Sequence, residues 1–183
     1  MIKSSAKRCA GVEKDTDLRN TIEKHLGVKI YPDIADIDEK FDLITLFHVL
    51  EHFKDPRDLL GRLSKVLTQH GVIIIEVPNA RDALLSLYDC KAFSEFTYWG
   101  CHLYLFDGSN LRALIRSAGL LVDSVEQIQR YPLSNHLYWL SQGKPGGHTI
   151  WNFLDSEELT RAYTSQLAAL GICDTLVATA RIR

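Results

Sequence analysis

Residues 41–52 read Phe-Asp-Leu-Ile-Thr-Leu-Phe-His-Val-Leu-Glu-His, and this stretch decides the fold class of the chain. The nearly unbroken apolar run at 43–47 is typical of a strand that is buried on both faces of a parallel sheet. The run ends at His48, Glu51 and His52, three side chains that can bind protons or a metal ion. In open α/β sheets, ligands bind beyond the carboxyl ends of the strands. The stretch therefore predicts a buried strand that leads directly into a functional site.

The composition is that of a globular protein with one core. With 183 residues and 46% hydrophobic content, the chain is expected to form a single domain that spans residues 1–183. The net charge of −2 offers no basic surface for nucleic acid. No apolar run approaches the roughly 20 residues that a membrane helix needs. Nucleic acid and membrane are therefore excluded as expected partners.

The cysteines and the first residues indicate the compartment. The four cysteines are scattered and include no Cys-x-x-Cys pair: Cys9, Cys90, Cys101 and Cys173. This pattern favours reduced thiols over a disulfide framework or a zinc site. Residues 1–8 carry charge without a following apolar segment, which is unlike a secretory signal. We therefore expect a cytoplasmic protein.

Strand and helix patterns alternate along the chain. Strands are expected at 9–13, 28–31, 43–47, 72–77, 120–128 and 175–182. Helices are expected from a cap at Thr16 or Asp17 to residue 26, at 55–70, from Asp107 or Ser109 to residue 118, and at 155–170. Residues 81–104 are expected to form short helices and a lid, and residues at about 129–153 a further lid or insertion. Alternation with short connections predicts an α/β fold with a parallel sheet and right-handed crossovers.

Several sequence blocks occur in an order that resembles a known family. They are Phe41-Asp42, His48-Val-Leu-Glu-His52, Asp55-Pro56, Gly71-Val-Ile-Ile-Ile-Glu-Val-Pro-Asn79, His102-Leu-Tyr-Leu-Phe106 and Asp174-Thr-Leu-Val-Ala178. In this combination the chain resembles the class I S-adenosylmethionine-dependent methyltransferases. The resemblance implies a Rossmann-like, mostly parallel sheet with an antiparallel last strand. It also implies S-adenosylmethionine as the cofactor and a small-molecule or sugar-type substrate.

The same resemblance assigns roles to individual residues. It implies that Glu13, at the end of strand 9–13, accepts hydrogen bonds from the ribose hydroxyls of the cofactor. The cofactor site then comprises Gly11, Glu13, Phe47 and His48, and the catalytic set comprises His48, Glu51 and His52. The residues expected to bind substrate are His102, Tyr131, Asn135 and His136. The expected reaction is O-methyl transfer, in which His48 or His52 helps to remove a hydroxyl proton.

One part of the family pattern is not found in this sequence. The family's first strand is the central one and leads into a Gly-x-Gly-x-Gly turn, whereas only eight residues precede Cys9 here. We therefore expect weakened cofactor binding, because that turn brings the backbone close to the methionine end of the cofactor. Three outcomes are open. The strands at 10–13 and 42–47 pair directly, a second chain fills the vacant central position in a homodimer, or the chain is an inactive product.

The polar cluster has three interpretations. Related families that carry Glu-x-x-Glu-His at this position and a later histidine bind a divalent metal. By that resemblance His48, Glu51, His52 and His102 could hold one, and two or three imidazoles favour zinc, manganese or iron over magnesium. They could instead line a metal-free pocket with one general base, or they could be purely structural. For the whole chain, the alternatives to a methyltransferase are a non-catalytic binding or oligomerisation module and a metal-dependent hydrolase.

Overall fold

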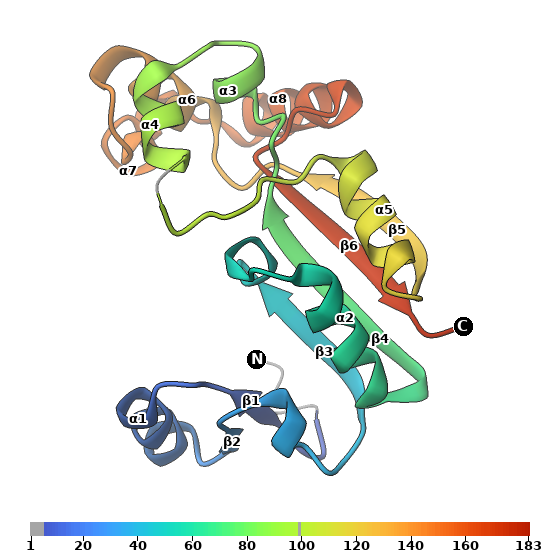
Figure 1. Cartoon of the computed structure of the whole chain (residues 1–183). Coiled ribbons are helices and arrows are strands. Elements are labelled where there is room, and N and C mark those ends of the chain that lie inside the picture. Colours follow the sequence, from blue (N-terminus) through green and yellow to red (C-terminus); the bar gives the residue numbers. More distant parts are fainter. Residues whose placement is uncertain (1–5, 99) are drawn as a thin grey trace.

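The structure is a computed structural model that describes residues 6–98 and 100–183, and it shows an α/β fold built on a four-stranded sheet (Figure 1). The strand order is β3-β4-β6-β5. The strands are β3 (Phe41–Phe47), β4 (Leu67–Pro78), β6 (Thr175–Arg181) and β5 (Leu121–Ile128). β3 and β4 run parallel, whereas β6 is antiparallel to both of its neighbours. The predicted antiparallel last strand is confirmed, and this sheet is mixed rather than mostly parallel.

A separate parallel pair precedes this sheet. β1 (Ala10–Val12) pairs with β2 (Lys29–Tyr31), and α1 (Thr16–Leu26) connects the two strands. Asp15 caps α1 with its side chain, whereas the sequence predicted Thr16 or Asp17 as the capping residue. Within the described residues β1 forms a ladder with β2 and not with β3. Direct pairing of the strands at 10–13 and 42–47, one of the three open outcomes, therefore does not occur.

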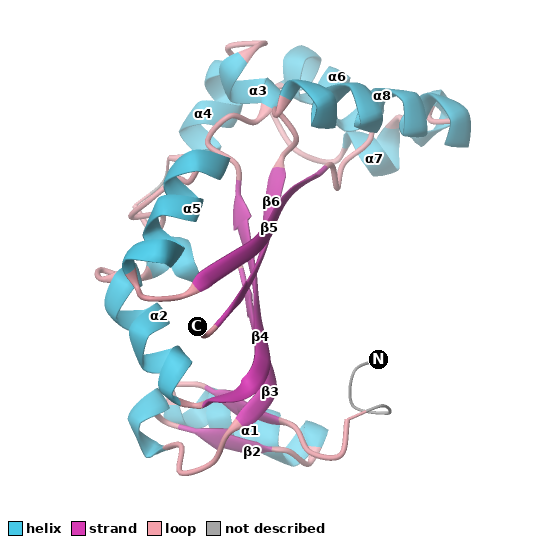
Figure 2. Ribbon diagram, turned by 90° about the vertical axis from the view of Figure 1, so that its right-hand side faces the viewer, coloured by secondary structure: helices cyan, strands magenta, loops and turns pink. Residues whose placement is uncertain are grey.

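β3 is less buried than its apolar sequence predicted. Leu43 is 42% exposed and Phe47 is 50% exposed, and Leu46 is the one buried residue of the strand. The reason is that β3 lies at the edge of the four-stranded sheet, and that the helices α2 (Pro56–Lys65) and α5 (Gly108–Ser117) cover one face of that sheet (Figure 2). The prediction of a strand buried on both faces is therefore wrong.

α2 (Pro56–Lys65) connects β3 to β4 and begins where the sequence predicted, with Asp55 as its side-chain cap. The helix ends earlier than expected, because Leu67 already pairs with Phe41 in the sheet. β4 therefore begins before the predicted strand at 72–77. This early return places β3 and β4 side by side over the full length of β3.

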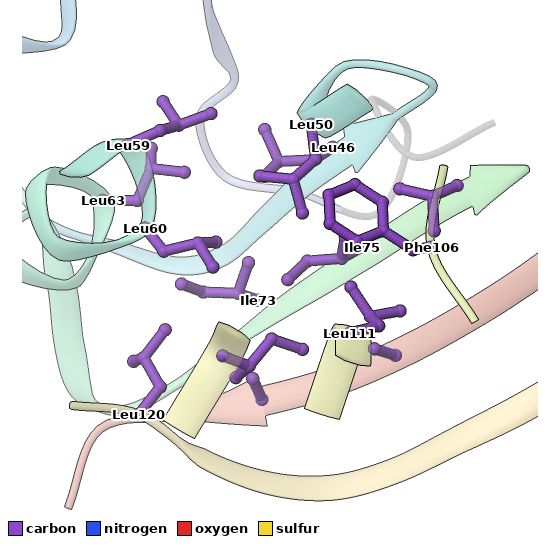
Figure 3. Packing of buried hydrophobic residues seen from close by; sticks show 14 of the residues in the cluster. Leu46, Leu50, Leu59, Leu60, Leu63, Ile73, Ile75, Phe106, Leu111 and Leu120 are labelled. Atoms are coloured by element: carbon purple, nitrogen blue, oxygen red, sulfur yellow. The ribbon is translucent and has the colours of Figure 1, made fainter. Parts of the chain in front are cut away.

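The hydrophobic core lies between the sheet and two helices, α2 and α5 (Gly108–Ser117) (Figure 3). Leu60 of α2 and Leu111 of α5 are fully buried in one cluster with Ile73 of β4. Leu50 belongs to the same cluster and anchors the short helix η3 (Leu50–His52), which follows β3. The core thus fixes the position of η3, where the predicted catalytic residues lie.

The remaining helices gather beyond the carboxyl ends of β3 and β4 (Figure 1). They are α3 (Ala83–Ser86), α4 (Lys91–Thr97), α6 (Leu133–Gln142), α7 (Gly147–Ile150) and α8 (Glu157–Leu170). We call α3, α4, α6 and α7 the lid, and they fall in the two segments for which the sequence predicted one. Among the described helices, none has the length and apolar character needed to cross a bilayer.

Candidate functional site

His48 stands where β3 ends, in a backbone conformation that few non-glycine residues adopt. Its φ is 52°, and its amide donates a hydrogen bond to the Glu76 carbonyl at 3.0 Å. This bond holds His48 against β4, and the left-handed backbone turns the chain from the strand into η3. Non-glycine residues with positive φ are concentrated at functional sites. The backbone therefore marks the same residue as the sequence motif.

The His48 ring lies among two carboxylates and a guanidinium. Nδ1 is 3.4 Å from Glu51 Oε1, and Nε2 is 3.0 Å from Glu76 Oε1. Arg130 Nη1 lies 2.7 Å from the same Nε2 and 3.0 Å from Glu76 Oε1. In the neutral ring Arg130 donates to Nε2, whereas in the protonated ring the Nε2–H donates to Glu76. His48 therefore has a partner in both protonation states.

These neighbours also set the pKa of His48. The Glu51 carboxylate, and after it Glu76, raise the pKa of His48 above its ordinary value, because both stabilise the imidazolium. Partial burial and the Arg130 guanidinium act in the opposite direction. A ring whose protonated form is stabilised in this way is a suitable acceptor for the proton of a substrate hydroxyl.

A cavity of about 330 Å³ separates the end of β3 from the lid, and we call it the lid cavity. Its lining includes five of the predicted site residues, which come from three separate segments: His48, His102, Tyr131, Asn135 and His136. Phe93, Phe96 and Trp139 form an aromatic wall, in which the rings of Phe93 and Trp139 meet edge to face at 5.1 Å. A pocket of this size, with aromatic walls and converging polar groups, is typical of a small-molecule site.

The His136 side chain is more deeply buried than a residue that binds substrate usually is. It is 2% exposed, and its two ring nitrogens lie 2.7 Å from the Tyr163 hydroxyl and 3.2 Å from the Gln129 side-chain amide. Burial lowers the pKa of His136 to about 4, so the ring is neutral near pH 7. His136 therefore shapes the floor of the lid cavity through fixed hydrogen bonds, and its predicted role in substrate binding stays a prediction.

Four charged residues around the lid cavity were not found from the sequence: Glu76, Asp82, Arg130 and Asp174. Asp174 accepts hydrogen bonds from the amides of Arg130, at 2.9 Å, and Tyr131, at 3.1 Å. It thereby holds the segment that carries Arg130 towards His48. Glu76 interrupts an apolar strand pattern near its end, and Asp174 directly precedes another; these positions were signals that could have identified both residues.

Asp82 is buried and caps α3 by accepting a hydrogen bond from the Leu84 amide at 2.7 Å. Burial raises the pKa of Asp82 to about 7, and the nearby Asp174 adds to the effect. The folded protein therefore holds a proton on Asp82 that the unfolded chain releases near its ordinary pKa. Stability from this group is present at low pH and is lost as pH rises through about 7.

Replacing Asp82 with asparagine is expected to remove this pH dependence, because the amide keeps the acceptor oxygen and cannot ionise. The quantity to compare is the unfolding free energy of Asp82→Asn minus that of the wild type. This difference should increase by about 2 kcal/mol between pH 5 and pH 7. Urea titrations at a series of pH values measure it. Burial of His136 makes stability rise with pH, but this contribution is the same in both proteins and cancels in the difference. Asp107→Asn at the exposed cap of α5 should show no such growth, and a constant Asp82→Asn difference would contradict the prediction.

Glu51, His52 and His102 form a second polar cluster beside His48. One ligand atom from each lies within 4.8 Å of the others. The structure thus brings together three of the four predicted metal ligands. The fourth, His48, contacts Glu51, but its Nε2 faces Glu76 and Arg130.

A second cavity, of about 290 Å³, lies between β1 and β3, and we call it the strand groove. Gly11 lines the strand groove, whereas Glu13, Phe47 and His48 are not among its lining residues. The side chains of the lining are apolar, with Thr45 as the single polar one. The Glu13 carboxylate accepts a hydrogen bond from the Asp15 amide at 2.8 Å. The predicted cofactor residues are therefore divided between the strand groove, the end of β1 and the end of β3.

Comparisons with known proteins agree with the fold. A methyltransferase domain family matches residues 4–125, which is more than half of the chain. A solved S-adenosylmethionine-dependent methyltransferase from Archaeoglobus fulgidus is 19% identical, with a TM-score of 0.57 over 93% of this chain and 74% of that one. A second, from Clostridium acetobutylicum, is 11% identical, with a TM-score of 0.54 over 98% and 76%.

A chain in the complex of the Haloferax volcanii Trm112 methyltransferase activator with a methyltransferase is 14% identical, with a TM-score of 0.60 over 95% and 71%. At these identities the solved structures show a shared fold. A comparison with curated proteins gave no match.

Proposed function

The chain belongs to the methyltransferase domain family, and from this premise we propose that it methylates a hydroxyl of a small-molecule or sugar-type acceptor bound in the lid cavity. The observation that carries the proposal is the placement of His48. Its ring lines the lid cavity, lies between two carboxylates and has a raised pKa. His52 does not line the cavity, so of the two histidines that the sequence offered we assign the role of base to His48.

The proton is removed by the residues of the chain itself. An acceptor hydroxyl that donates to His48 Nε2 takes the place of Arg130 Nη1, which lies 2.7 Å from that nitrogen. Arg130 keeps Glu76 as its partner at 3.0 Å. When the proton moves to Nε2, the carboxylates of Glu51 and Glu76 stabilise the imidazolium. The charge that develops on His48 is thus already balanced before the reaction begins.

The lid cavity favours an acceptor with a flat ring or a sugar face. Phe93, Phe96 and Trp139 offer aromatic surfaces for stacking. The lining also includes the polar side chains of His48, Asn79 and Asp174. An acceptor that stacks on the aromatic wall can therefore direct a hydroxyl towards the end of β3, where the base stands.

S-adenosylmethionine, which the family implies, is matched by the described residues in part. Glu13, at the end of β1, offers carboxylate oxygens to the ribose hydroxyls. Among the described residues, those that line the strand groove include no charged side chain for the amino-acid end of the cofactor. When bound, the cofactor supplies the electrophilic methyl group. The residues present therefore fit the ribose half of the cofactor, and not its charged half.

We expect this partial fit to appear as weak cofactor affinity. S-adenosylmethionine should bind with a dissociation constant weaker than about 100 µM, which corresponds to about 5.5 kcal/mol of binding free energy. Isothermal titration calorimetry measures it, and Glu13→Gln should weaken binding further. Micromolar affinity would contradict the weakened-cofactor part of the proposal. It would leave His48 as the proposed base.

The alternative is a non-catalytic binding or oligomerisation module. One observation favours it, because Val12 and Leu43 line the strand groove and are 47% and 42% exposed. In this alternative a second copy of the chain fills the groove, and light scattering would show a dimer that Leu43→Lys disrupts. A monomer at all concentrations would count against it. The family match favours both of these proposals over a metal-dependent hydrolase.

Two further assignments belong to the proposal. The proposed cytoplasmic location rests on the scattered spacing of Cys9, Cys90, Cys101 and Cys173, which include no Cys-x-x-Cys pair. The proposed proton transfer uses His48 and needs no metal ion. A metal ion beside Glu51 would therefore not be required for the proposed methyl transfer.

A further inference from the structure

Glu51 is a buried carboxylate whose oxygens accept no hydrogen bond from the described residues. It is 0% exposed, and both Oε1 and Oε2 are buried without a hydrogen-bond partner. Among the described residues, the groups within ion-pair distance of this carboxylate are His48 Nδ1, at 3.4 Å, and His52 Nε2, at 4.0 Å. A carboxylate removed from water in this way is costly unless a cation compensates for it. Protonated His48 compensates for this charge from one side, and a cation on the side of His52 and His102 would compensate for it from the other.

The two histidines beside Glu51 are oriented as metal ligands are. His52 Nδ1 lies 2.7 Å from the Cys101 carbonyl, and His102 Nδ1 lies 2.8 Å from the Thr97 carbonyl. A carbonyl can only accept, so each Nδ1 carries the proton and each neutral ring has its lone pair on Nε2. A ligating histidine typically donates its other N–H to a carbonyl or carboxylate, which fixes the tautomer and the ring direction.

The backbone holds these residues together without help from a bound ion. The amides of Leu103 and Tyr104 both donate to the Glu51 carbonyl, at 2.9 Å and 3.2 Å. These bonds dock the segment that carries His102 onto η3. The rings of His52 and His102 consequently lie 5.0 Å apart between centroids. Residues distant in sequence are thus arranged in advance of any ligand.

We propose that Glu51, His52 and His102 bind a divalent transition-metal ion, with zinc as the preferred one. Their ligand atoms lie within 4.8 Å of one another. Neighbouring ligands of a tetrahedral zinc ion are roughly 3.3 Å apart, so the three ligand atoms must draw somewhat closer together on binding. Two imidazoles and one carboxylate suit zinc, with a remaining position for water or a ligand, and do not suit magnesium.

The ligand set excludes His48 and does not depend on the proposed methyl transfer. His48 Nε2 is already placed between Glu76 and Arg130. The metal would occupy the side of Glu51 that faces His52 and His102. Since His102 also lines the lid cavity, the open coordination position would be next to the cavity.

Zinc binding by the untagged protein tests the proposal directly. Competition with a chromophoric chelator should show one Zn²⁺ per chain for the wild type. Affinity should fall at least about tenfold in His52→Ala and in His102→Ala, as expected when one ligand is lost. The matched control is His70→Ala, which removes an exposed histidine on β4 and should bind as the wild type does. Co²⁺ should give a visible absorption band in the wild type and His70→Ala only.

Three results would overturn the proposal. The first is no stoichiometric zinc in the wild type. The second is equal affinity in His52→Ala, His102→Ala and His70→Ala. The third is loss of binding in Cys101→Ser with retention in His52→Ala, which would assign the ion to the exposed thiol. Because His52 is exposed, its replacement leaves the fold intact, and the test does not depend on removing Glu51.

Discussion

Replacing His48 with asparagine is expected to lower kcat for methyl transfer by about 100- to 1,000-fold, the usual contribution of a general base. Asparagine tolerates the left-handed backbone that His48 adopts, with φ at 52°. It cannot accept a proton near pH 7. The variant therefore removes the base while it keeps the turn from β3 into η3.

The assay measures S-adenosylhomocysteine formed from millimolar S-adenosylmethionine and a panel of phenols and sugars, so that weak cofactor affinity does not limit the rate. His70→Asn, an exposed histidine on β4, is the matched control and should keep the wild-type rate. A KM that changes little while kcat falls would locate the effect in the proton transfer. Equal kcat in His48→Asn and the wild type would refute the role of base.

Replacing Gly147 with alanine is expected to cost about 3 kcal/mol of unfolding free energy. A Cβ at Gly147 would lie 2.4 Å from the Ser134 carbonyl oxygen and 2.4 Å from Tyr138 Cβ. Neither atom can rotate away, because both are fixed by the backbone of α6. The helices α6 and α7 must therefore separate to accept the methyl group, and the lid loses its packing.

Gly61 provides the matched control for this substitution. It lies within α2, and a Cβ there would meet nothing within 4 Å. Gly61→Ala should therefore stabilise the protein, by about 0.5 to 1 kcal/mol, through helix propensity alone. Guanidinium titrations of both variants give the two values. A Gly147→Ala variant as stable as the wild type would show that α6 and α7 do not pack as described.

Local rules in the sequence predicted those parts of the fold that short segments determine. Asp55 caps α2 as expected, and Gly27 and Gly171 close α1 and α8 with φ at 59° and 71°. These features depend on hydrogen bonds within a few residues. They can therefore be recognised from a few letters of sequence.

The errors concern features that depend on distant neighbours. An apolar run such as 43–47 does not reveal how many strands or helices will cover it, and β3 lies at an edge with one face largely open. The end of α2 was misplaced, because the pairing of Leu67 with Phe41 overrides helix propensity. Asx and glycine patterns carry no information about such pairings.

The sequence identified several residues of the candidate site, but it did not predict how they contact one another. His48, His102 and Tyr131 do line one cavity, since segments that follow strand ends meet at the same edge of a sheet. The pairing of His48 with Glu76 and Arg130 was not predicted, because it joins three segments whose register the sequence does not specify.

The central claim is that an acceptor hydroxyl binds in the lid cavity against His48. Two-dimensional NMR of the ¹⁵N-labelled protein, titrated with phenol as the probe, tests it most directly. The account predicts saturable shifts of the Trp139 indole N–H and of the His48 ring nitrogens, and both should be lost when Trp139 is replaced by alanine. Shifts confined to Val12 and Leu43 in the strand groove, or no saturable shift at all, would contradict it.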